Sequence, residues 1–194
     1  AALAGAVYVV FGKSSGWLAS YELNSTFVNG TNGFALLGSG SGMVNGDRMG
    51  LGVALGDLNN DGYDDIVATG KTTAHVVLGK GTAWSASSNF SSYFLMDTTP
   101  TAYQGHMAVV ANINGDDYDD ILLASPNGSA TLYIVFGNNG TWTGSIDLTT
   151  MLASTGVRYQ GIHLYDGIVF DGLGAGDVNG DGILDYTDFE ILYD

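Results

Sequence analysis

An internal repeat constrains the fold of this chain more than any other feature of its sequence. Three apolar, strand-like runs each end in glycine: VYVVFG at residues 7–12, HVVLG at 75–79 and LYIVFG at 132–137. A polar turn and then a tryptophan follow each run, at Trp17, Trp84 and Trp142. Self-similarity at intervals of tens of residues is typical of stacked supersecondary units.

Each repeat also contains a variable stretch, an acidic loop and a second apolar run. We assign three units, at residues 1–70, 71–126 and 127–194. The chain has thirty Gly but two Pro, and its frequent Tyr, Val, Ile, Phe and Thr favour short strands joined by tight turns. One small sheet cannot bury both of its faces, so neighbouring units must stack. We therefore predict an all-β chain of about three four-stranded antiparallel sheets, arranged as β-propeller-type blades.

The acidic loops concentrate the negative charge of the chain. Residues 56–65, 111–120 and 176–188 each hold four Asp, together twelve of the twenty acidic residues. In the first acidic loop (57–65), oxygen-bearing side chains stand at positions 1, 3, 5 and 9 and a glycine at position 6. Calcium accepts this mixture of carboxylate, amide and backbone carbonyl oxygens. Without a cation, neighbouring carboxylates repel each other by roughly 1 kcal/mol or more per pair.

We predict structural Ca²⁺ in these loops, at up to three sites, with position 7 offering its backbone carbonyl. The candidate ligands are Asp57, Asn59, Asp61, Tyr63 and Asp65; Asn112, Asn114, Asp116, Tyr118 and Asp120; and Asp177, Asn179, Asp181, Ile183, Asp185 and Asp188. Magnesium fits less well, because it prefers fewer protein ligands and keeps its waters. A solvated turn is the alternative for any single loop, and three matches at one place in a repeat count against it.

The second and third acidic loops differ from the first in informative ways. In the second loop (112–120), Asn112 replaces the first Asp, and Asp117 replaces the turn glycine. We expect weaker binding there, with one ligand charge fewer and a strained turn. The third loop (177–185) restores the full pattern, and Asp188 follows at position 12.

The order of these motifs resembles the FG-GAP repeat of integrin α subunits and of many surface proteins. The residues that carry the resemblance are Phe11-Gly12, Phe136-Gly137 and Ala124-Ser125-Pro126, with Leu78-Gly79 and Ala68-Thr69-Gly70 as departures. The stretch GTNGFALLGSG at 30–40 is also similar to the segment between strands in that family. The resemblance implies calcium held in loops between blade strands, and extracellular adhesion or scaffolding.

Three blades cannot close a propeller ring, which in this family usually has about seven blades. The chain is then a fragment of a larger propeller, a multimer that completes the ring, or an open stack. Exposed sheet edges template pairing with other chains, so we expect a homo-oligomer or polymer formed through blade edges. The C-terminal stretch also resembles half a dockerin, and Thr187-Asp188-Phe189-Glu190 reads as a capping box that starts a short helix. Both continuations remain open from the sequence.

Five Asn-x-Ser/Thr sequons lie in polar, turn-like stretches, at Asn24, Asn29, Asn89, Asn127 and Asn139. They are candidate glycosylation sites if the chain is secreted by a eukaryote. Other motifs are discounted. GKSSG at 12–16 is a repeat turn without the helix that a nucleophile elbow needs. We expect the three tryptophans to pack between blades.

Composition excludes several classes of partner. The net charge of −15 argues against nucleic acid and anionic membrane surfaces, which need basic residues. The chain has no cysteine, so it has neither disulfides nor thiolate metal sites. No apolar run approaches the length of about 18 residues that a membrane span requires. Because the sequence starts at Ala1 without a basic n-region, we interpret it as a mature or excised segment.

We therefore predict a non-enzymatic, calcium-binding structural or adhesion protein, located outside the cell or on its surface. It would self-assemble into a surface filament or multimer. The alternative is a carbohydrate- or protein-binding recognition module of a larger propeller receptor. An enzyme built on a propeller is the third hypothesis, but the sequence shows no convergent acid, base and nucleophile.

Overall fold

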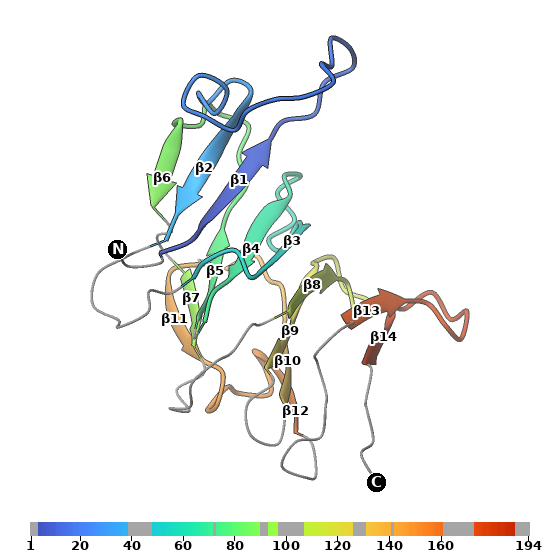
Figure 1. Cartoon of the computed structure of the whole chain (residues 1–194). Coiled ribbons are helices and arrows are strands. Elements are labelled where there is room, and N and C mark those ends of the chain that lie inside the picture. The colour runs from blue at the N-terminus through green and yellow to red at the C-terminus, as the bar shows by residue number, and fades with distance from the viewer. Residues whose placement is uncertain are drawn as a thin grey trace, which may run out of the picture.

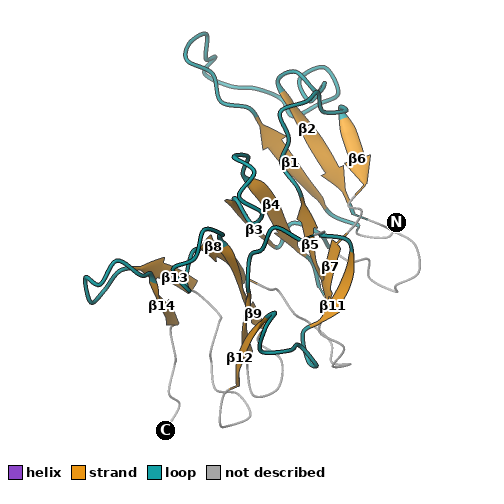
Figure 2. Cartoon of the chain, turned by 180° about the vertical axis from the view of Figure 1, so that it is seen from behind, coloured by secondary structure: helices purple, strands orange, loops and turns teal. Residues whose placement is uncertain are grey.

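The computed structural model describes residues 4–38, 48–71, 73–89, 93–96, 107–125, 131–140, 142–160 and 173–188. These residues form fourteen strands in four sheets, and no helix occurs among them (Figure 1; Figure 2). In these ranges, accordingly, no helix has the length and apolar character needed to cross a membrane. The all-β prediction is confirmed.

Each sheet is defined here by its strands in their spatial order. Sheet 1 consists of β1 (Ala6–Val10), β2 (Gly33–Leu37) and β6 (Ser87–Asn89). Sheet 2 consists of β11 (Gly144–Asp147), β7 (Tyr93–Met96), β5 (Thr73–Val77), β4 (Asp65–Thr69) and β3 (Gly52–Gly56). Sheet 3 consists of β12 (Gly156–Gln160), β10 (Thr131–Val135), β9 (Asp120–Ser125) and β8 (Met107–Ala111). Sheet 4 consists of β13 (Leu173–Gly176) and β14 (Asp185–Asp188).

The sheets are blade-like, as predicted, but their strand counts differ from three equal sets of four. Sheet 3 is the expected four-stranded antiparallel sheet. Sheet 2 has the same antiparallel core of four strands, and β11 from the following unit adds to β7 in parallel. Sheet 1 gains β6 in the same parallel way. Chain segments that cross between units therefore extend the outer edges of the blades.

The blades are offset from the sequence units. The boundary between residues 70 and 71 falls between β4 and β5, which pair within sheet 2. The boundary between residues 126 and 127 likewise falls between β9 and β10 of sheet 3. Each sequence unit thus ends one blade and starts the next.

Three apolar clusters hold consecutive sheets together. In β4 and β9 the buried side chains alternate between two faces, as strand geometry requires. Ile66 of β4 packs with Phe34 and Leu36 of sheet 1, while Val67 faces sheet 3 and packs with Ile121. Leu122, on the opposite face of β9, belongs to the cluster that includes Leu173 and Tyr186 of sheet 4. Burying each such aliphatic side chain stabilises the stack by roughly 1.5–3 kcal/mol.

Among the described residues the stack is open. Sheet 1 lies at one end and the β13–β14 hairpin at the other, in both views (Figure 1; Figure 2). No described strand joins sheet 4 to sheet 1. The stack therefore resembles an arc of blades that has not closed into a ring.

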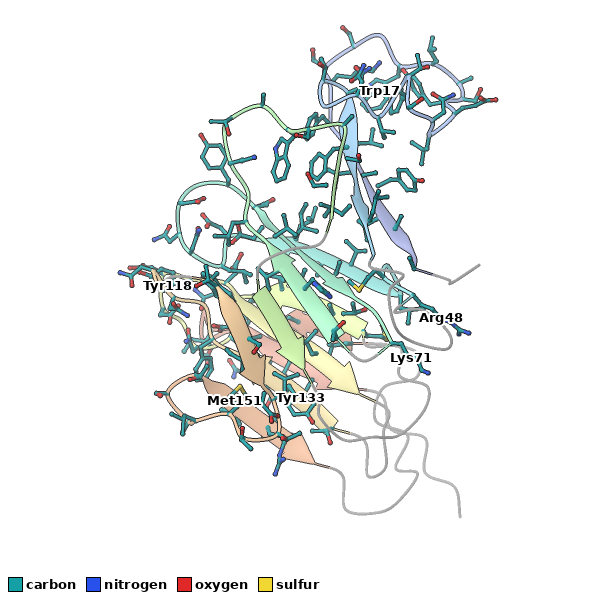
Figure 3. The ribbon with its side chains drawn as sticks, turned by 90° about the vertical axis from the view of Figure 1, so that its left-hand side faces the viewer. Trp17, Arg48, Lys71, Tyr118, Tyr133 and Met151 are labelled. Atoms are coloured by element: carbon teal, nitrogen blue, oxygen red, sulfur yellow. The ribbon has the colours of Figure 1, made fainter. Side chains whose placement is uncertain are left out.

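The prediction that the tryptophans pack between blades is confirmed for two of the three. Trp84 stacks on Phe34 of sheet 1, with ring centroids 4.1 Å apart, and Trp142 is buried between sheets 2 and 3. Trp17 is 55% exposed and lies at the far end of sheet 1 (Figure 3). The prediction is wrong there for the described residues, because the ring packs edge-on against Tyr21 of the same loop and not against a neighbouring sheet.

The segment after the third acidic loop is a strand as far as the structure describes it. In β14, Asp185 pairs with Gly176, as Asp65 pairs with Gly56 and Asp120 with Ala111. Thr187, expected to cap a helix, belongs to this strand, because pairing with β13 holds its backbone extended. Residues 189–194, which complete the predicted short C-terminal helix, lie outside the described residues.

Candidate functional site

The three acidic loops occupy equivalent places in three hairpins. Each loop connects the first two strands of a blade, and the loops line up along one side of the stack (Figure 1). The aspartate at position 9, namely Asp65, Asp120 or Asp185, is the first residue of β4, β9 or β14. The fold therefore brings together, within each loop, the side chains that the sequence pattern predicted.

The position-9 aspartate closes each loop on itself. Oδ2 of Asp65 accepts a hydrogen bond from the backbone N–H of Leu58 at 3.0 Å. The corresponding bonds are 2.9 Å from Ile113 to Asp120 and 3.0 Å from Val178 to Asp185. A charge-assisted hydrogen bond is stronger than a neutral one. This contact therefore holds the first residues of all three loops in the same way.

The second carboxylate oxygen explains the glycine that ends the second and third apolar runs. Oδ1 of Asp65 accepts from the N–H of Gly79 at 2.7 Å, and Oδ1 of Asp120 accepts from Gly137 at 2.9 Å. A Cβ on Gly79 would lie 2.4 Å from the carbonyl oxygen of Asp64, and one on Gly137 would lie 2.2 Å from that of Asp119. Neither position has room for a side chain. The glycine that ends the apolar run, here called the motif glycine, therefore packs directly against the preceding acidic loop. We call this contact the seat of the loop.

This seating role was missed from the sequence, although a signal was present. The spacing from the position-9 aspartate to the next motif glycine is similar in the two cases, 65 to 79 and 120 to 137. It brackets one strand pair in both, which is the arrangement that places the two residues side by side across neighbouring antiparallel strands.

Burial changes the acidity of these seated aspartates. Asp65 and Asp120 are fully buried. The pKa of Asp65 is raised from 3.8 to about 6, mainly by desolvation and to a smaller extent by the Asp61 and Asp57 charges, against the opposing effect of the two N–H donors. Desolvation likewise raises the pKa of Asp120. The folded loops therefore hold carboxylates that are costly to ionise without a counter-charge.

In the first acidic loop, the side chains at positions 1, 3 and 5 converge. Asp57 Oδ1 and Asn59 Oδ1 both accept from the N–H of Asp61, at 3.0 and 3.1 Å. Asp57 Oδ2 accepts from Gly62 at 2.8 Å, and Asp61 Oδ1 accepts from Tyr63 at 2.9 Å. Gly62 adopts a positive φ of 86°, a backbone conformation that favours glycine.

The third acidic loop repeats this arrangement. Asp177 accepts from the N–H groups of Asp181 and Gly182 at 3.1 and 2.9 Å, and Asn179 accepts from Asp181 at 2.9 Å. Gly182 has a φ of 86°, the same as its counterpart in the first loop. Ile183 donates to Asp181 at 2.9 Å. The first and third loops thus share one frame despite different neighbours.

The second acidic loop departs from that frame. Asn112 accepts from the N–H of Gly115 at 2.8 Å, and its amide nitrogen donates to the carbonyl of Asp116. Asp117 does not adopt a positive φ, whereas Gly115 does, at 74°. The expected strained turn at Asp117 is therefore wrong. Position 4 has a positive φ in all three loops, at Asn60, Gly115 and Gly180, and the second loop differs from the other two at position 6. An amide N–H₂ group now points where the first loop has a carboxylate.

The predicted position-7 ligands lie inside the loops, whereas Asp188 lies outside the third loop. The position-7 residues Tyr63, Tyr118 and Ile183 lie within the loops, and their N–H groups donate to the position-5 aspartates. Figure 3 shows Tyr118 on the loop side of the stack. Asp188 lies beyond the third loop, in β14, where it pairs with Leu173.

The donors of the first and third loops fit a hard divalent cation in their chemistry. They are all oxygens, from carboxylate, amide and backbone carbonyl, and the repulsion of Asp65 by Asp61 and Asp57 shows that the charges are close enough to interact. In the described arrangement these oxygens face the N–H groups of their own loop. Accordingly, no group of three or more His, Cys, Asp or Glu among the described residues forms a metal centre.

Neighbouring loops are locked to each other, through a residue that the sequence analysis did not single out. Asp119, at position 8 of the second loop, accepts from the N–H of Asp57 at 3.0 Å through Oδ2, and its own N–H donates to the Asp57 carbonyl at 3.1 Å. Asn138 donates to the carbonyl of Leu58 at 3.0 Å. The geometry of the first loop therefore depends on the next blade.

The predicted glycosylation positions are exposed wherever their side chains are described. Asn24, Asn29 and Asn139 lie at the surface. Asn24 and Asn29 also accept backbone N–H groups two residues ahead, at 3.0 and 2.9 Å, as is typical of Asx turns. The side chain of Asn89 and the whole of Asn127 lie outside the described residues.

Comparisons with known proteins point the same way as the geometry. Residues 57–122 match the profile of the FG-GAP-like repeat. Integrin alpha-V from Gallus gallus is 28% identical over 144 residues, which are 71% of this chain and 13% of the integrin. The chain thus spans a small part of the length of the curated relative it matches. The predicted resemblance to FG-GAP repeats of the integrin α type is confirmed, and the sheets are consistent with blades of that kind.

Proposed function

From an FG-GAP-like repeat set among stacked blades, we propose that this chain is a non-enzymatic, extracellular adhesion-type module whose acidic loops bind structural calcium. The observation that carries the proposal is the frame shared by the first and third loops. In both, oxygen-bearing side chains at positions 1, 3, 5 and 9 gather around a turn with glycine at position 6. The similarity to integrin alpha-V supports the adhesion-type and extracellular parts.

Calcium would be held by Asp57, Asn59, Asp61 and Asp65 and the Tyr63 carbonyl in the first loop. The third loop offers Asp177, Asn179, Asp181, Asp185 and the Ile183 carbonyl. The bound ion supplies positive charge that offsets carboxylate repulsion. The chain's own part is to hold the position-9 aspartate in place through the Leu58 or Val178 N–H group. Calcium binding and folding are then linked, because the ion favours the folded loop.

The second loop is the weakest of the three candidates. Its first side chain is an amide whose nitrogen already donates within the loop, and it carries one ligand charge fewer. We expect isothermal titration of chelator-treated chain with calcium to find two tight sites and a third that is far weaker or undetectable. Asp57→Asn and Asp177→Asn should each remove one tight site. Titration without heat or saturation for either loop would overturn the proposal.

The surface role includes self-association through blade edges, as a filament or multimer. The sheet architecture is compatible with this part, because an unpaired strand edge can add to another chain. Sequons at Asn24, Asn29, Asn89, Asn127 and Asn139 would carry glycans on the secreted protein. Loss of mass after treatment with a peptide-N-glycosidase checks that point, and an unchanged mass in natively secreted chain would refute it.

A second candidate is a carbohydrate- or protein-recognition module, favoured by one exposed aromatic group. Trp17 packs edge-on against Tyr21 with ring centroids 6.4 Å apart, and Lys13 lies over the Trp17 ring at 5.1 Å. Exposed tryptophan faces are suited to apolar sugar faces or peptide anchors. A glycan-array ligand that is lost on Trp17→Ala, in a chain that stays monomeric, would favour this function over assembly.

A further inference from the structure

The backbone at the start of the first acidic loop is held mainly by the next blade. Asp57 donates its N–H to Asp119 Oδ2 at 3.0 Å, and its carbonyl accepts the N–H of Asp119 at 3.1 Å. The Leu58 carbonyl accepts from the N–H of Asn138 at 3.0 Å. Only the Leu58 N–H binds within its own loop, at Asp65. Residues next to strands of sheet 3 therefore make three of these four contacts.

A glycine makes room for this contact between the blades. Gly56, the last residue of β3, is buried. A Cβ on Gly56 would lie 2.6 Å from Asp119 Oδ2 and 2.3 Å from Val110 Cγ1. Because Gly56 has no side chain, the Asp119 carboxylate reaches the N–H of the next residue, Asp57. Gly56 and Asp119 are thus a complementary pair, one residue from each blade.

The junction between the second and third loops has a different pair at the same two places. Ala111 is the last residue of β8, as Gly56 is of β3. Leu184 stands at position 8 of the third loop, where Asp119 stands in the second. The leucine side chain carries no acceptor for a backbone N–H. The small residue and the acceptor are therefore replaced together.

The two junctions differ accordingly in what joins their loops. Among the described residues, no hydrogen bond connects Leu184 with Asn112, the first residue of the second loop. The contact there is apolar, with Ile183 Cγ1 at 3.4 Å from the Cβ position of Gly115. The hydrogen-bonded contact between loops is thus a property of the first loop, and the second loop, which lacks it, closes differently.

Asp57 is the residue through which this contact can influence cation binding. Its two carboxylate oxygens accept from the N–H groups of Asp61 and Gly62, at 3.0 and 2.8 Å, so its side chain organises the turn that contains the other candidate ligands. The direction of that side chain depends on the Asp57 backbone, which Asp119 holds on both sides. Residues that orient a metal ligand without touching the metal typically change affinity by about 10–100-fold when they are mutated.

We propose that Asp119 is a positioning residue of the first calcium site, which is therefore shared between sheets 2 and 3. Its carboxylate holds the Asp57 backbone in the orientation that presents the Asp57 carboxylate to the ion. This inference rests on the proposed calcium binding, to which it adds a dependence on the neighbouring blade. Because coupling between two sites is reciprocal, calcium bound in the first loop strengthens the contact between the two sheets.

Calorimetric titration with calcium tests this in the Asp177→Asn chain, where the first loop is the remaining tight site. Asp119→Ala in that chain should raise the dissociation constant by about tenfold or more. Asp119→Asn should restore most of the affinity, because its amide oxygen can accept the N–H of Asp57. An Asp119→Asn chain that binds as weakly as Asp119→Ala would show a charge effect instead, and would overturn the positioning role.

Two controls separate positioning from a general loss of negative charge. Asp64→Ala removes an exposed carboxylate at position 8 of the first loop itself, and it should weaken binding far less than Asp119→Ala, because exposed charges are screened. In the Asp57→Asn chain, where the third loop is the remaining tight site, Asp119→Ala should leave the dissociation constant unchanged. Equal losses of affinity in both loops would contradict the inference.

A double variant guards against misfolding of the single ones. Gly56→Ala combined with Asp119→Leu copies the Ala111 and Leu184 pair that the chain already accommodates at its next junction. It should keep a cooperative thermal transition in excess chelator and lose the same calcium affinity in the first loop as Asp119→Ala. A folded double variant that retains wild-type affinity there would overturn the inference.

Amide hydrogen exchange in calcium and in chelator tests the reciprocal effect. Calcium should slow exchange at Asp119 and Asn138, whose N–H groups bind first-loop carbonyls, and Asp57→Asn should abolish this slowing. Unchanged exchange at both residues in calcium-loaded wild type would contradict the coupling. A wild type that binds no calcium would remove the proposed function together with this inference. Full first-loop affinity in Asp119→Ala would remove this inference alone.

Discussion

The first and second acidic loops lie side by side on neighbouring blades, and Asp119 of the second bonds to the backbone of Asp57 in the first. Both are seated alike, since Asp65 and Asp120 each bind the motif glycine of the next strand. They differ in how they close. Asp57 accepts from Gly62 in the first loop, whereas the Asn112 amide donates to Asp116 in the second.

The difference separates two roles that a single acidic motif combines. The position-9 aspartate and the motif glycine belong to the fold, because they tie the loop to the blade in both cases. Positions 1 and 6 serve cation binding, because the residues there decide whether carboxylate oxygens or an amide nitrogen face the inside of the loop. The second loop keeps the first role and loses much of the second.

Removing the seated aspartate should have the largest effect, and an equal one in both loops. Asp65→Ala and Asp120→Ala each leave at least two backbone N–H groups without their buried acceptor, at about 1–3 kcal/mol per group. We expect a loss of about 3–5 kcal/mol in the free energy of unfolding, measured by urea denaturation in excess chelator. A much smaller loss of unfolding free energy for Asp120→Ala than for Asp65→Ala would show that the two aspartates do not have equivalent structural roles.

Filling the seats is expected to be the next largest effect. Gly79→Ala and Gly137→Ala bring a Cβ to 2.4 and 2.2 Å from a backbone carbonyl oxygen, and overpacking of this kind typically costs about 1–3 kcal/mol. Gly12→Ala is the matched control, because its Cβ meets nothing described within 4 Å. Thermal melts of the three variants at low protein concentration check this, and equal melting temperatures would contradict it.

Exchanging positions 1 and 6 should transfer calcium binding between the loops. Asn112→Asp combined with Asp117→Gly gives the second loop the residues of the first, and we expect one additional tight site by calorimetry. At a calcium concentration about 100 times the dissociation constant, one site stabilises by about 2.7 kcal/mol. Asp57→Asn should remove a similar amount. If the double variant gains no site, the second loop is limited by its backbone path.

The smallest effect concerns pH in the absence of calcium. The pKa of Asp65 is raised from 3.8 to about 6 in the folded chain, so the folded state binds a proton more tightly than the unfolded state. Its contribution to stability is fully present below 3.8 and is lost as pH rises through about 6. Chelated chain should therefore gain stability between pH 7 and pH 5. Asp65→Asn should flatten part of that slope, and Asp120 supplies the remainder.

Much of the fold was predictable because its signals are periodic and local. The apolar runs that end at Gly12, Gly79 and Gly137 predicted strands, and the loops at 57–65 and 177–185 form as their side-chain spacing indicated. The offset between sequence units and blades was not predictable. It arises because β4, the last strand of the first unit, pairs with β5, the first strand of the second unit. No residue pattern within one unit encodes that pairing.

The site was predicted less completely than the fold. The spacing of oxygen-bearing residues identified the loop positions, but the buried tie between Asp65 and Gly79 joins residues on different strands. The sequence shows that the second loop lacks a glycine at position 6, but it does not show that Asp117 there avoids the positive φ that Gly62 and Gly182 adopt. The contact of Asp119 with Asp57 joins two blades, and the spacing of residues within either loop does not predict it.

The central claim, that calcium holds the acidic loops and with them the blades, is tested most directly by thermal unfolding of the whole chain in millimolar calcium and in excess chelator. Two occupied sites are expected to raise the melting temperature by about 10 °C or more, since about 1 kcal/mol corresponds to about 2–4 °C in a chain of this size. Asp57→Asn combined with Asp177→Asn should abolish most of that difference. Identical melting temperatures of the wild type in calcium and in chelator would contradict the account.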